Sequence, residues 1–498
     1  MSKQHTQLAA IDLGSNSFHM IIGRLENGQV KVIDKLREMV RLASGLTDKN
    51  DLTDEARERA LNCLKIFGQR LKDFPPNTVF AVGTNTLRKA KQAGDFLDLA
   101  EEALGHPIEI ISGVEEARLV FLGVANSLGS NTEDKRLVVD IGGGSTELIV
   151  GQAFNHEWLE SLYMGCVSYS QRFFKDGELN ERNMTRAEIY AQIELEPVKS
   201  VIKQKGWQQA IGTSGTIRAI QSVITAMDSK SHHITLDKML EIRQQVIAAE
   251  HIDNLSLKGL KPERAPVFAG GLAILISTFE ALGIKQITVS PGALREGLLY
   301  DEVGRTQQVD VRQKAVSNFM KHYHVDQLQA DRVLKTALTL QAGFNDGNDV
   351  FDSEIQLLMQ FAIQLHEVGL AISHSQYHKH GEYLTQHTDI AGFTQQEQLF
   401  VARLVRTHRR KIPNAIFKEL PRRYRTPAKK ACLLIRLAVL FNRSRSNTEL
   451  PPINIVTNKQ QITLQFPEGW LEAHPLTQTD LSIENDYWTS LNYELLIE

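Results

Sequence analysis

The chain has 498 residues, of which 42% are hydrophobic and 23% charged, so it can bury large cores and is not disordered as a whole. Its length corresponds to roughly three to four domains of ordinary size. A net charge of −3 names no partner, and three widely spaced cysteines without a CxxC pair indicate neither a disulfide framework nor a thiolate zinc site. No apolar run reaches the ~18 residues of a membrane span and the first residues are polar, so we expect a cytoplasmic protein, free or peripheral to the membrane, without a membrane span.

The first predicted elements are two strands joined by a polar turn that contains glycine. Residues 8–23 read as a strand, the turn Asp12-Leu-Gly14-Ser15-Asn16-Ser17 and a returning strand, and a similar strand end follows at Val82-Gly83-Thr84. Glycine lets the backbone approach an anion closely, and Ser and Thr add hydroxyl donors. Each turn alone is equally typical of an ordinary hairpin. The candidate phosphate contacts in these turns are Ser15, Asn16, Ser17 and Thr84.

An acidic pair follows the predicted strand Ile108–Ile111. Glu115 and Glu116 fall in the first turn of a predicted helix that runs to about Ala125. Acids in this position often only complement the helix dipole. However, this strand-to-helix junction opens toward the same edge as the glycine turns, so one carboxylate could deprotonate a water for attack on phosphorus. Arg88 could neutralise charge on the transferred group, or it could be a helix-surface arginine.

The same elements recur about 130 residues later. The pattern Asp-x-Gly-x-x-Ser at Asp12 returns at Asp140 with an offset of 128, and the glycine of Gly83-Thr84 returns at Gly212 with an offset of 129. Because the two motifs recur with almost the same offset, we predict a duplicated α/β unit whose two halves form a phosphate-binding cleft. The strand, turn and helix at Pro291–Gly297 are expected to be structural. The candidate phosphate contacts of this half are Gly142, Gly143, Gly144, Ser145, Thr146 and Gly215.

Carboxylates at the base of the two turns predict a metal ion. Asp12 and Asp140 end apolar strands, where a carboxylate suits phosphate only if it holds Mg²⁺ or a metal-bound water. Glu147 lies on the returning strand near the same turn, and its alternative is a solvent-facing position.

Seven segments resemble the exopolyphosphatase / guanosine pentaphosphate phosphatase family, which shares its fold with actin, heat-shock ATPases and sugar kinases. The segments are Ala10–Met20, Gly83–Arg88, Ile110–Val124, Val138–Leu148, Met164–Ser168, Gly212–Thr216 and Pro291–Tyr300. The resemblance implies Mg²⁺-dependent removal of a terminal phosphate, with Glu116 as the catalytic glutamate. It implies metal and phosphate ligands at Asp140, Glu147 and residues 142–146, phosphate contacts at residues 15–17 and Arg88, and a homodimer.

The last two hundred residues change character at about Thr306, where amphipathic helices begin. His366-Glu367 resembles the HD motif of metal phosphohydrolases, with Glu in place of the metal-binding Asp, so we expect a degenerate HD-like domain whose histidines pack rather than bind metal. Three short alternating segments, Ile453–Thr457, Gln461–Phe466 and Tyr493–Ile497, predict the strands of a small cap. The expected architecture is α/β: two duplicated actin-like (ribonuclease H-like) domains, then an all-α HD-like domain and a small α+β domain. The expected boundaries are 1–125, 126–304, 305–445 and 446–498.

The strongest charge signal lies at residues 403–430, where eleven Lys and Arg face one acid, Glu419, for a formal charge of +10. Such a run is often a solvated face, but it also suits a polyanion track. Few aromatic residues interrupt it, so no specific nucleic acid is expected.

We therefore expect a phosphoric anhydride hydrolase, and we place exopolyphosphatase first: processive release of orthophosphate from inorganic polyphosphate, with Glu116 as general base and Mg²⁺, with K⁺ as a candidate stimulant. The alternative is hydrolysis of guanosine pentaphosphate (pppGpp) to ppGpp. Polyphosphate ranks first because a short nucleotide needs no track of ten charges, and because the segment from His374 to His380 resembles the exopolyphosphatase branch more closely. An alternative of another class is a catalytically inactive regulator that binds polyanions.

Overall fold

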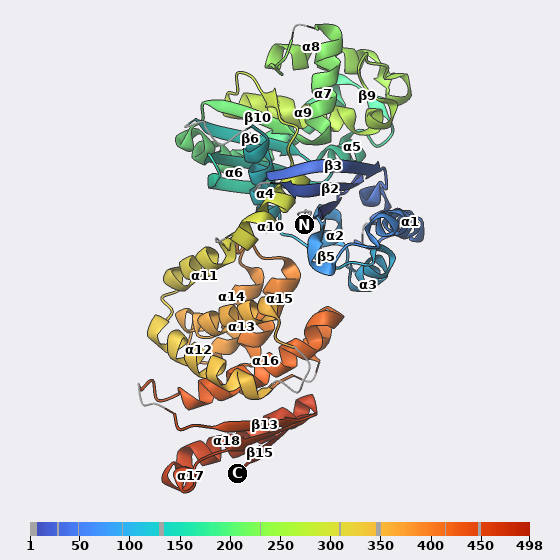
Figure 1. Ribbon diagram of the computed structural model, residues 1–498. Coiled ribbons are helices and arrows are strands. Elements are labelled where there is room, and N and C mark those ends of the chain that lie inside the picture. The colour runs from blue at the N-terminus through green and yellow to red at the C-terminus, as the bar shows by residue number, and fades with distance from the viewer. Residues whose placement is uncertain are drawn as a thin grey trace. The chain divides into compact units, whose positions relative to one another are not determined.

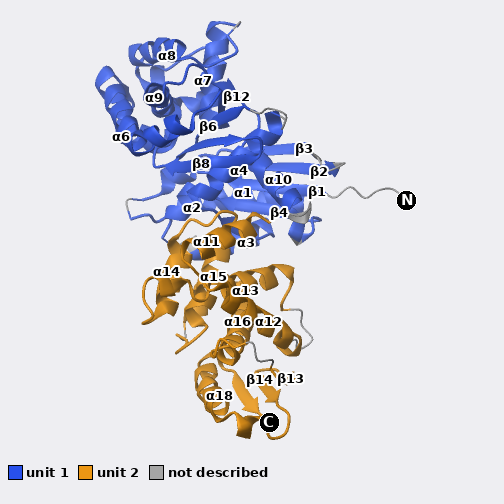
Figure 2. Ribbon diagram, turned by 90° about the vertical axis from the view of Figure 1, so that its left-hand side faces the viewer, with its two compact units in different colours: residues 1–309 blue, residues 310–498 orange. Residues whose placement is uncertain are grey.

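The computed structural model describes the chain except residues 1–6, 27–28, 48, 92, 129–133, 230, 308–309, 345–349, 414 and 447–449. The chain forms two compact units, residues 1–309 and 310–498 (Figure 2). Both units contain helices and strands, so the expected mixed α/β class is confirmed, while the four finer boundaries stay a prediction.

Unit 1, coloured from blue to yellow in Figure 1, contains two five-stranded sheets that have the same strand order. The orders are β3-β2-β1-β4-β5 and β8-β7-β6-β10-β12, and in each sheet the first three strands are antiparallel and the last three parallel. The duplication read from the turns therefore extends to the topology. The strands of the two sheets are β1 (Gln7–Leu13), β2 (Phe18–Glu26), β3 (Gln29–Glu38), β4 (Val79–Gly83), β5 (Ile108–Ile110), β6 (Lys135–Ile141), β7 (Thr146–Gln152), β8 (Asn155–Leu162), β10 (Gln209–Thr213) and β12 (Thr288–Val289).

Helices cover both sheets because central strands such as β1 and β6 are apolar on both faces. The outer face of the first sheet packs against α1 and α3, and the second sheet packs against α5, α6, α7 and α9. The helices of unit 1 are α1 (Asp54–Leu71), α2 (Asn85–Lys89), α3 (Ala93–Leu104), α4 (Gly113–Leu128), α5 (Cys166–Phe173), α6 (Glu181–Lys205), α7 (Ser214–Met227), α8 (Leu236–Ala248), α9 (Ala265–Leu282) and α10 (Leu294–Gln307). A short pair of strands, β9 (Glu178–Leu179) and β11 (Glu250–His251), lies beside them.

Helices α4 and α10 join the two halves of unit 1. Their apolar side chains share one core with the inner faces of both sheets. The two helices approach closely through glycine, since a Cβ on Gly123 would lie 2.0 Å from the carbonyl oxygen of Ala293. This contact fixes the start of α10 against α4, and both helices begin at the edge where the turns lie.

Helix α9 is apolar all round. The stretch Pro262–Leu282 is long and apolar enough to pass for a membrane span by length and composition, but most of it is buried inside unit 1. This burial is typical of the core helix of a large domain.

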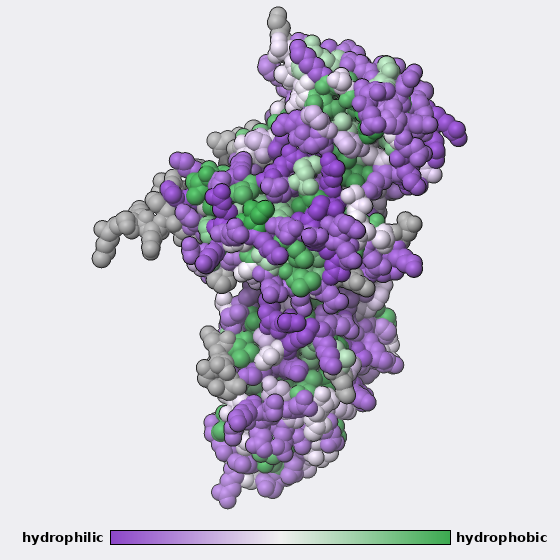
Figure 3. All heavy atoms as spheres, turned by 90° about the vertical axis from the view of Figure 1, so that its right-hand side faces the viewer, coloured by the Kyte–Doolittle hydropathy of each residue, from purple (hydrophilic) through white to green (hydrophobic). Residues whose placement is uncertain are grey.

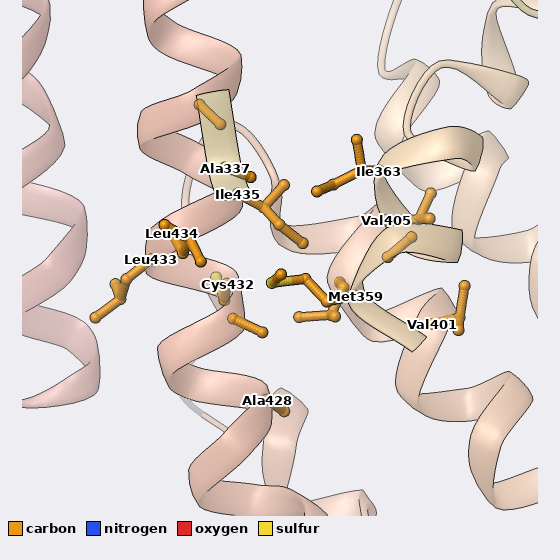
Figure 4. Close-up of a cluster of buried hydrophobic side chains, with 14 of the residues drawn as sticks. Ala337, Met359, Ile363, Val401, Val405, Ala428, Cys432, Leu433, Leu434 and Ile435 are labelled. Carbon is orange, nitrogen blue, oxygen red and sulfur yellow. The ribbon is translucent and has the colours of Figure 1, made fainter. Parts of the chain in front are cut away.

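Unit 2 consists of helices followed by a small sheet. Side chains from α12, α13, α15 and α16 point toward one another in its core (Figure 4). The strands β13, β14 and β15 form one sheet, and their buried side chains belong to the same core as the helices. The elements are α11 (Val311–His322), α12 (Gln327–Gln341), α13 (Ser353–Leu365), α14 (Tyr377–His387), α15 (Gln395–Thr407), α16 (Arg422–Phe441), β13 (Asn454–Asn458), β14 (Gln461–Gln465), α17 (Trp470–Ala473), α18 (Pro475–Trp488) and β15 (Glu494–Ile497). The face of the molecule drawn in Figure 3 is mainly hydrophilic, with small apolar patches.

Candidate active site

A cavity of about 500 Å³ lies in unit 1 where the strands of both sheets end. Asp12 and Asp140 lie near the ends of β1 and β6, one in each sheet. Thr84 and Ser214 come directly after β4 and β10. Open α/β sheets bind ligands at this carboxyl edge because the backbone amides of the following turns are free to point outward. The size is that of a pocket for a small molecule.

The glycine turns of the two halves touch each other. A Cβ on Gly143 would lie 2.8 Å from the Cβ of Ser15, and a Cβ on Gly144 would lie 2.7 Å from Oδ1 of Asn85. The Thr86 hydroxyl donates a hydrogen bond of 2.8 Å to the Ser15 hydroxyl. The residue types that predicted phosphate binding are therefore also required for this close packing of the turns.

The structure brings most of the predicted residues together. Two of them do not line the cavity: Thr146 is fully buried and donates to the carbonyl of Met164 at 2.6 Å, and Arg88 lies against Glu116. The predicted residues that do line it are Asp12, Ser15, Asn16, Ser17, Thr84, Glu116, Asp140, Gly142, Gly143, Gly144, Ser145, Glu147 and Gly215.

The acidic pair at the start of α4 is divided between two tasks. Glu115 is buried and accepts hydrogen bonds of 2.8 and 2.7 Å from Arg118, which also pairs with Asp301. Glu116 lines the cavity, and its Oε2 lies 2.9 Å from Nη1 of Arg88. The same Arg88 nitrogen donates to the carbonyl of Ile111 at 2.8 Å. Arg88 thus holds the one member of the pair that faces the cavity.

Three further carboxylates are buried in the cavity floor. Burial raises the pKa of Asp12 to about 7 and that of Asp140 to about 6, and it raises the pKa of Glu147 well above its usual range. Asp140 and Glu147 are directly opposite each other on β6 and β7, and the Ser161 hydroxyl donates to Glu147 at 2.8 Å. The neighbouring carboxylate of Glu116 raises the pKa of all three further.

These carboxylates suit a hard cation. Oδ1 of Asp12 and Oδ1 of Asp140 are both buried, and neither has a hydrogen-bond partner in the described part of the chain. Within the same described part, no three His, Cys, Asp or Glu side chains form a group that could hold a metal by themselves. Mg²⁺ commonly takes only one or two protein carboxylates and completes its shell with water and substrate phosphate. The residues present therefore fit a cation that binds together with a phosphate.

Six Lys and Arg side chains, here called the basic wall, line the same cavity as these acids, and most of them could not be identified from the sequence. Arg295 lies within a segment already noted for its motif and Arg218 lies two residues after another, but the others follow no pattern that sequence alone could pick out. Because β3 and the loop before α9 reach the cavity only in the folded chain, their cations look like ordinary surface residues in the sequence. The cavity-lining cations are Lys35, Arg37, Arg218, Lys261, Arg264 and Arg295.

His19 is also a cavity residue that the sequence did not identify. Burial and the surrounding arginines, Arg295 first among them, lower the pKa of His19 to about 2. The imidazole therefore stays neutral, and its Nδ1 accepts a hydrogen bond of 2.6 Å from Nη1 of Arg295.

The fold and this site can be compared with known proteins. Residues 21–306 match the Ppx/GppA phosphatase family, and residues 311–485 match Ppx/GppA phosphatase, domain III. The chain belongs to the Ppx/GppA phosphatase family. Its two units correspond to these two matches, and the family explains the actin-like fold of the first.

Two relatives match the Ppx/GppA chain over nearly its full length. A Vibrio cholerae protein is 39% identical over 98% of both chains, and a Vibrio parahaemolyticus protein is 38% identical over 98% of this chain and 97% of the relative. Both are named guanosine-5'-triphosphate,3'-diphosphate pyrophosphatase.

Solved structures of the family match about three fifths of this chain. The Ppx/GppA family member of Aquifex aeolicus has a TM-score of 0.52 at 26% identity, with 61% of this chain and 99% of that one covered. An exopolyphosphatase from Cytophaga hutchinsonii has a TM-score of 0.54 at 26% identity, with 60% of this chain and 98% of that one covered. The comparisons thus favour the guanosine pentaphosphate alternative over the exopolyphosphatase that the sequence analysis placed first.

The predicted basic track of this Ppx/GppA chain is not one exposed face. Arg403 is buried and pairs with Glu382 and Glu419, and Arg406 also pairs with Glu382. Lys430 is buried too. A narrower basic pocket of about 900 Å³ remains in unit 2, and its charged lining is Lys379, Arg406, Arg409, Arg410 and Lys411.

The HD-like pair also lies in unit 2. His366 is buried and its Nδ1–H donates to the carbonyl of Ile363 at 2.6 Å, while Glu367 pairs with Arg445. That these histidines pack rather than bind metal, and that the domain is related to HD domains, both stay predictions.

Proposed function

We propose that this protein hydrolyses the terminal 5'-phosphate of guanosine 5'-triphosphate,3'-diphosphate (pppGpp), with Mg²⁺, to release orthophosphate and guanosine 3',5'-bis(diphosphate). The observation that carries the proposal is that one cavity is lined by four carboxylates and by six Lys and Arg side chains. The acidic floor suits a metal and a reacting phosphate, and the basic wall suits a substrate that carries several more phosphates. The names of the two Vibrio relatives support the choice of this nucleotide.

Glu116 is the general base of the proposed reaction. Its carboxylate lines the cavity and takes a proton from a water molecule as the water oxygen forms a bond to the terminal phosphorus. The phosphoanhydride bond to the leaving β-phosphate breaks in the same displacement, and the electron pair leaves with the bridging oxygen. Arg88 orients the Glu116 carboxylate through the 2.9 Å contact and fixes it to the strand end at Ile111.

Asp12, Asp140 and Glu147 are the proposed Mg²⁺ ligands, with a metal held directly or through water. When bound there, Mg²⁺ supplies positive charge to the oxygens of the reacting phosphate. The turn amides and the hydroxyls of Ser15, Ser17 and Ser145 bind the same phosphate. This arrangement explains why buried carboxylates with unpartnered oxygens lie next to turns built for an anion.

Most cations of the basic wall are available to bind the rest of the substrate. Six cations line the cavity, and pppGpp retains four phosphate groups beyond the one removed, two on each side of the ribose. Arg and Lys pair with phosphates at short range, and Arg does so with two parallel donors. The wall therefore favours a substrate with many phosphates over a simple nucleoside triphosphate.

Inorganic polyphosphate is the second candidate substrate. It is supported by membership of a family with exopolyphosphatases and by the basic pocket of unit 2, whose lining carries five cations and no acid. The cations of that pocket suit the phosphates of a polyanion.

The test is orthophosphate release with Mg²⁺ from pppGpp and from long-chain polyphosphate, side by side at low and high salt. We expect a higher kcat/KM for pppGpp and a moderate salt dependence. A preference for polyphosphate that salt abolishes steeply would instead support the second candidate. Release from neither substrate would contradict both and leave the polyanion-binding regulator.

A further inference from the structure

We infer that Arg295 is the catalytic cation of this cavity, contacting the reacting phosphate, and that His19 is the residue that positions it. The inference rests on the proposed hydrolysis of a phosphoanhydride and assigns the charge that such a reaction needs beyond its metal. From the sequence, Arg88 was expected to neutralise charge on the transferred phosphate, and the segment that contains Arg295 was expected to be structural.

Arg295 is held in the cavity from two sides. It lies in the first turn of α10, where Glu296 accepts a hydrogen bond of 3.0 Å from the backbone N–H of Ala293 and so fixes the helix start. Its guanidinium lines the cavity and donates to Nδ1 of His19 at 2.6 Å. A guanidinium has donors only, so Nδ1 of His19 must be the unprotonated acceptor.

The register of the first sheet places this pair beside the acidic floor. His19 on β2 is directly opposite Asp12 on β1, and directly opposite residues in an antiparallel pair have Cβ atoms about 5 Å apart. An arginine held by His19 therefore lies next to a proposed metal ligand. Consistently, Arg295 is the strongest of the charges that lower the pKa of Asp12 against the effect of burial, and it also lowers that of Asp140.

The placement of Arg88 supports the same assignment. Arg88 does not line the cavity, and its described contacts go to Glu116 and the carbonyl of Ile111. The transferred phosphoryl group spreads negative charge over its oxygens, and a fixed cation there stabilises the transition state. Arg295 is the lining cation that acts on both Asp12 and Asp140 and has a dedicated acceptor, so it is best placed for that task.

His19 has no acid–base role in this scheme. The lone pair of Nδ1 accepts the hydrogen bond from Arg295. This bond holds the long, flexible side chain of Arg295 in one orientation. The carbonyl oxygen of Asn can approximate the position of Nδ1, whereas Leu supplies bulk and no acceptor. These two replacements therefore separate the hydrogen bond from packing.

The experiment measures kcat and KM for orthophosphate release from pppGpp with Mg²⁺ in the full-length protein. The variants are Arg295→Met, Arg295→Lys, His19→Asn, His19→Leu and the double variant His19→Leu/Arg295→Met. Arg182→Met is the matched control, because Arg182 is an exposed arginine of α6 outside the cavity. Thermal unfolding of each variant checks that it folds.

We expect Arg295→Met to lower kcat by ~100-fold with a much smaller change in KM, as for loss of one donor that acts in the transition state. His19→Leu should lower kcat by ~10-fold, His19→Asn should recover most of that loss, and His19→Leu should cost nothing further once Arg295 is Met. The Arg182 variant should match the wild type. A merely structural His19 would instead reduce activity in both backgrounds and would not be rescued by Asn.

Retention of kcat in Arg295→Met would overturn the inference while the proposed function stands. If the effects of the two positions on kcat are independent and multiply, His19 does not act through Arg295, and that part of the inference is wrong. If Arg295→Met does not fold, Arg295→Lys supplies the test, since it keeps the charge but replaces the planar fork, whose two terminal nitrogens can serve His19 and phosphate separately, with a single nitrogen; full kcat in that variant would also overturn the inference. A wild type that hydrolyses neither pppGpp nor polyphosphate would end the proposed function and this inference with it.

Discussion

Glu115 and Glu116 are neighbours in sequence but have different partners, so exchanging each for Gln separates chemistry from stability. In Glu116→Gln the general base is lost and kcat should fall by ~10³-fold, equivalent to ~4 kcal/mol in activation free energy. The free energy of unfolding should change by no more than ~1 kcal/mol, because Arg88 keeps its hydrogen bond to Ile111 and both charged side chains retain some solvent contact.

Glu115→Gln should show the reverse. Arg118 is buried and loses one of its two acidic partners, keeping Asp301, so the free energy of unfolding should fall by ~2 kcal/mol. Because Glu115 does not line the cavity, the kcat of the folded enzyme should stay within a few-fold of the wild type.

The assay combines orthophosphate release with urea unfolding on both variants, and it adds binding of pppGpp to the Glu116 variant by calorimetry. Glu116→Gln should still bind the nucleotide. The reasoning is refuted if Glu116→Gln turns over at a rate near the wild type, or if Glu115→Gln is the variant that loses kcat without losing stability.

Three further perturbations follow from the structure. Burial raises the pKa of Asp12 in the metal-free protein to about 7, so the affinity for Mg²⁺ should rise as the pH approaches about 7. The free energy of unfolding of the metal-free protein should fall from about pH 4 to about pH 7, because the folded carboxyl keeps a proton that the unfolded one loses. Asp12→Asn should reduce that pH dependence of unfolding and leave the share of Asp140 and Glu147, and an unchanged slope would exclude Asp12 as a source. Gly143→Ala should lower kcat/KM by at least ~10-fold, since its Cβ would lie 2.8 Å from that of Ser15; a fully active variant would show that the turns need no such contact. Arg436→Met should lower the free energy of unfolding by ~3 kcal/mol, because Glu484 would lose its buried partner, and urea titration should detect this; the Arg436→Met/Glu484→Met variant should recover part of the loss.

Much of the site's acidic floor could be predicted from local patterns. Asp12 and Asp140 lie where an apolar strand leads into a glycine turn. Both the strand and the turn can be recognised from a few consecutive residues. The duplication could be predicted as well, because two copies of one pattern with nearly one offset fold into one topology. The three short strands near the C-terminus also follow from alternation and lie within about a residue of their expected positions.

The ion-pair partners of charged residues could not be predicted from the sequence. The run at residues 403–430 was read as a continuous track, but Arg403 is buried between Glu382 and Glu419. One of these acids lies outside the run, in α14, so no window of sequence around the run contains it. The ranking of polyphosphate above pppGpp depended in part on that track, and the comparisons favour pppGpp.

The sequence by itself thus determined the strands, the glycine turns and the carboxylates at their ends, because these depend on hydrophobic pattern and backbone freedom over short stretches. The family resemblance already pointed to Glu116, but only the tertiary structure showed that Glu115 is buried against Arg118 and that Arg88 holds Glu116. Only the tertiary structure also showed that Arg295 meets His19 across 276 positions of the chain. An ion pair or a cavity wall is made by side chains from distant segments, and their meeting depends on how helices and sheets pack. Charge in a sequence shows what a residue can bind, and packing selects the partner.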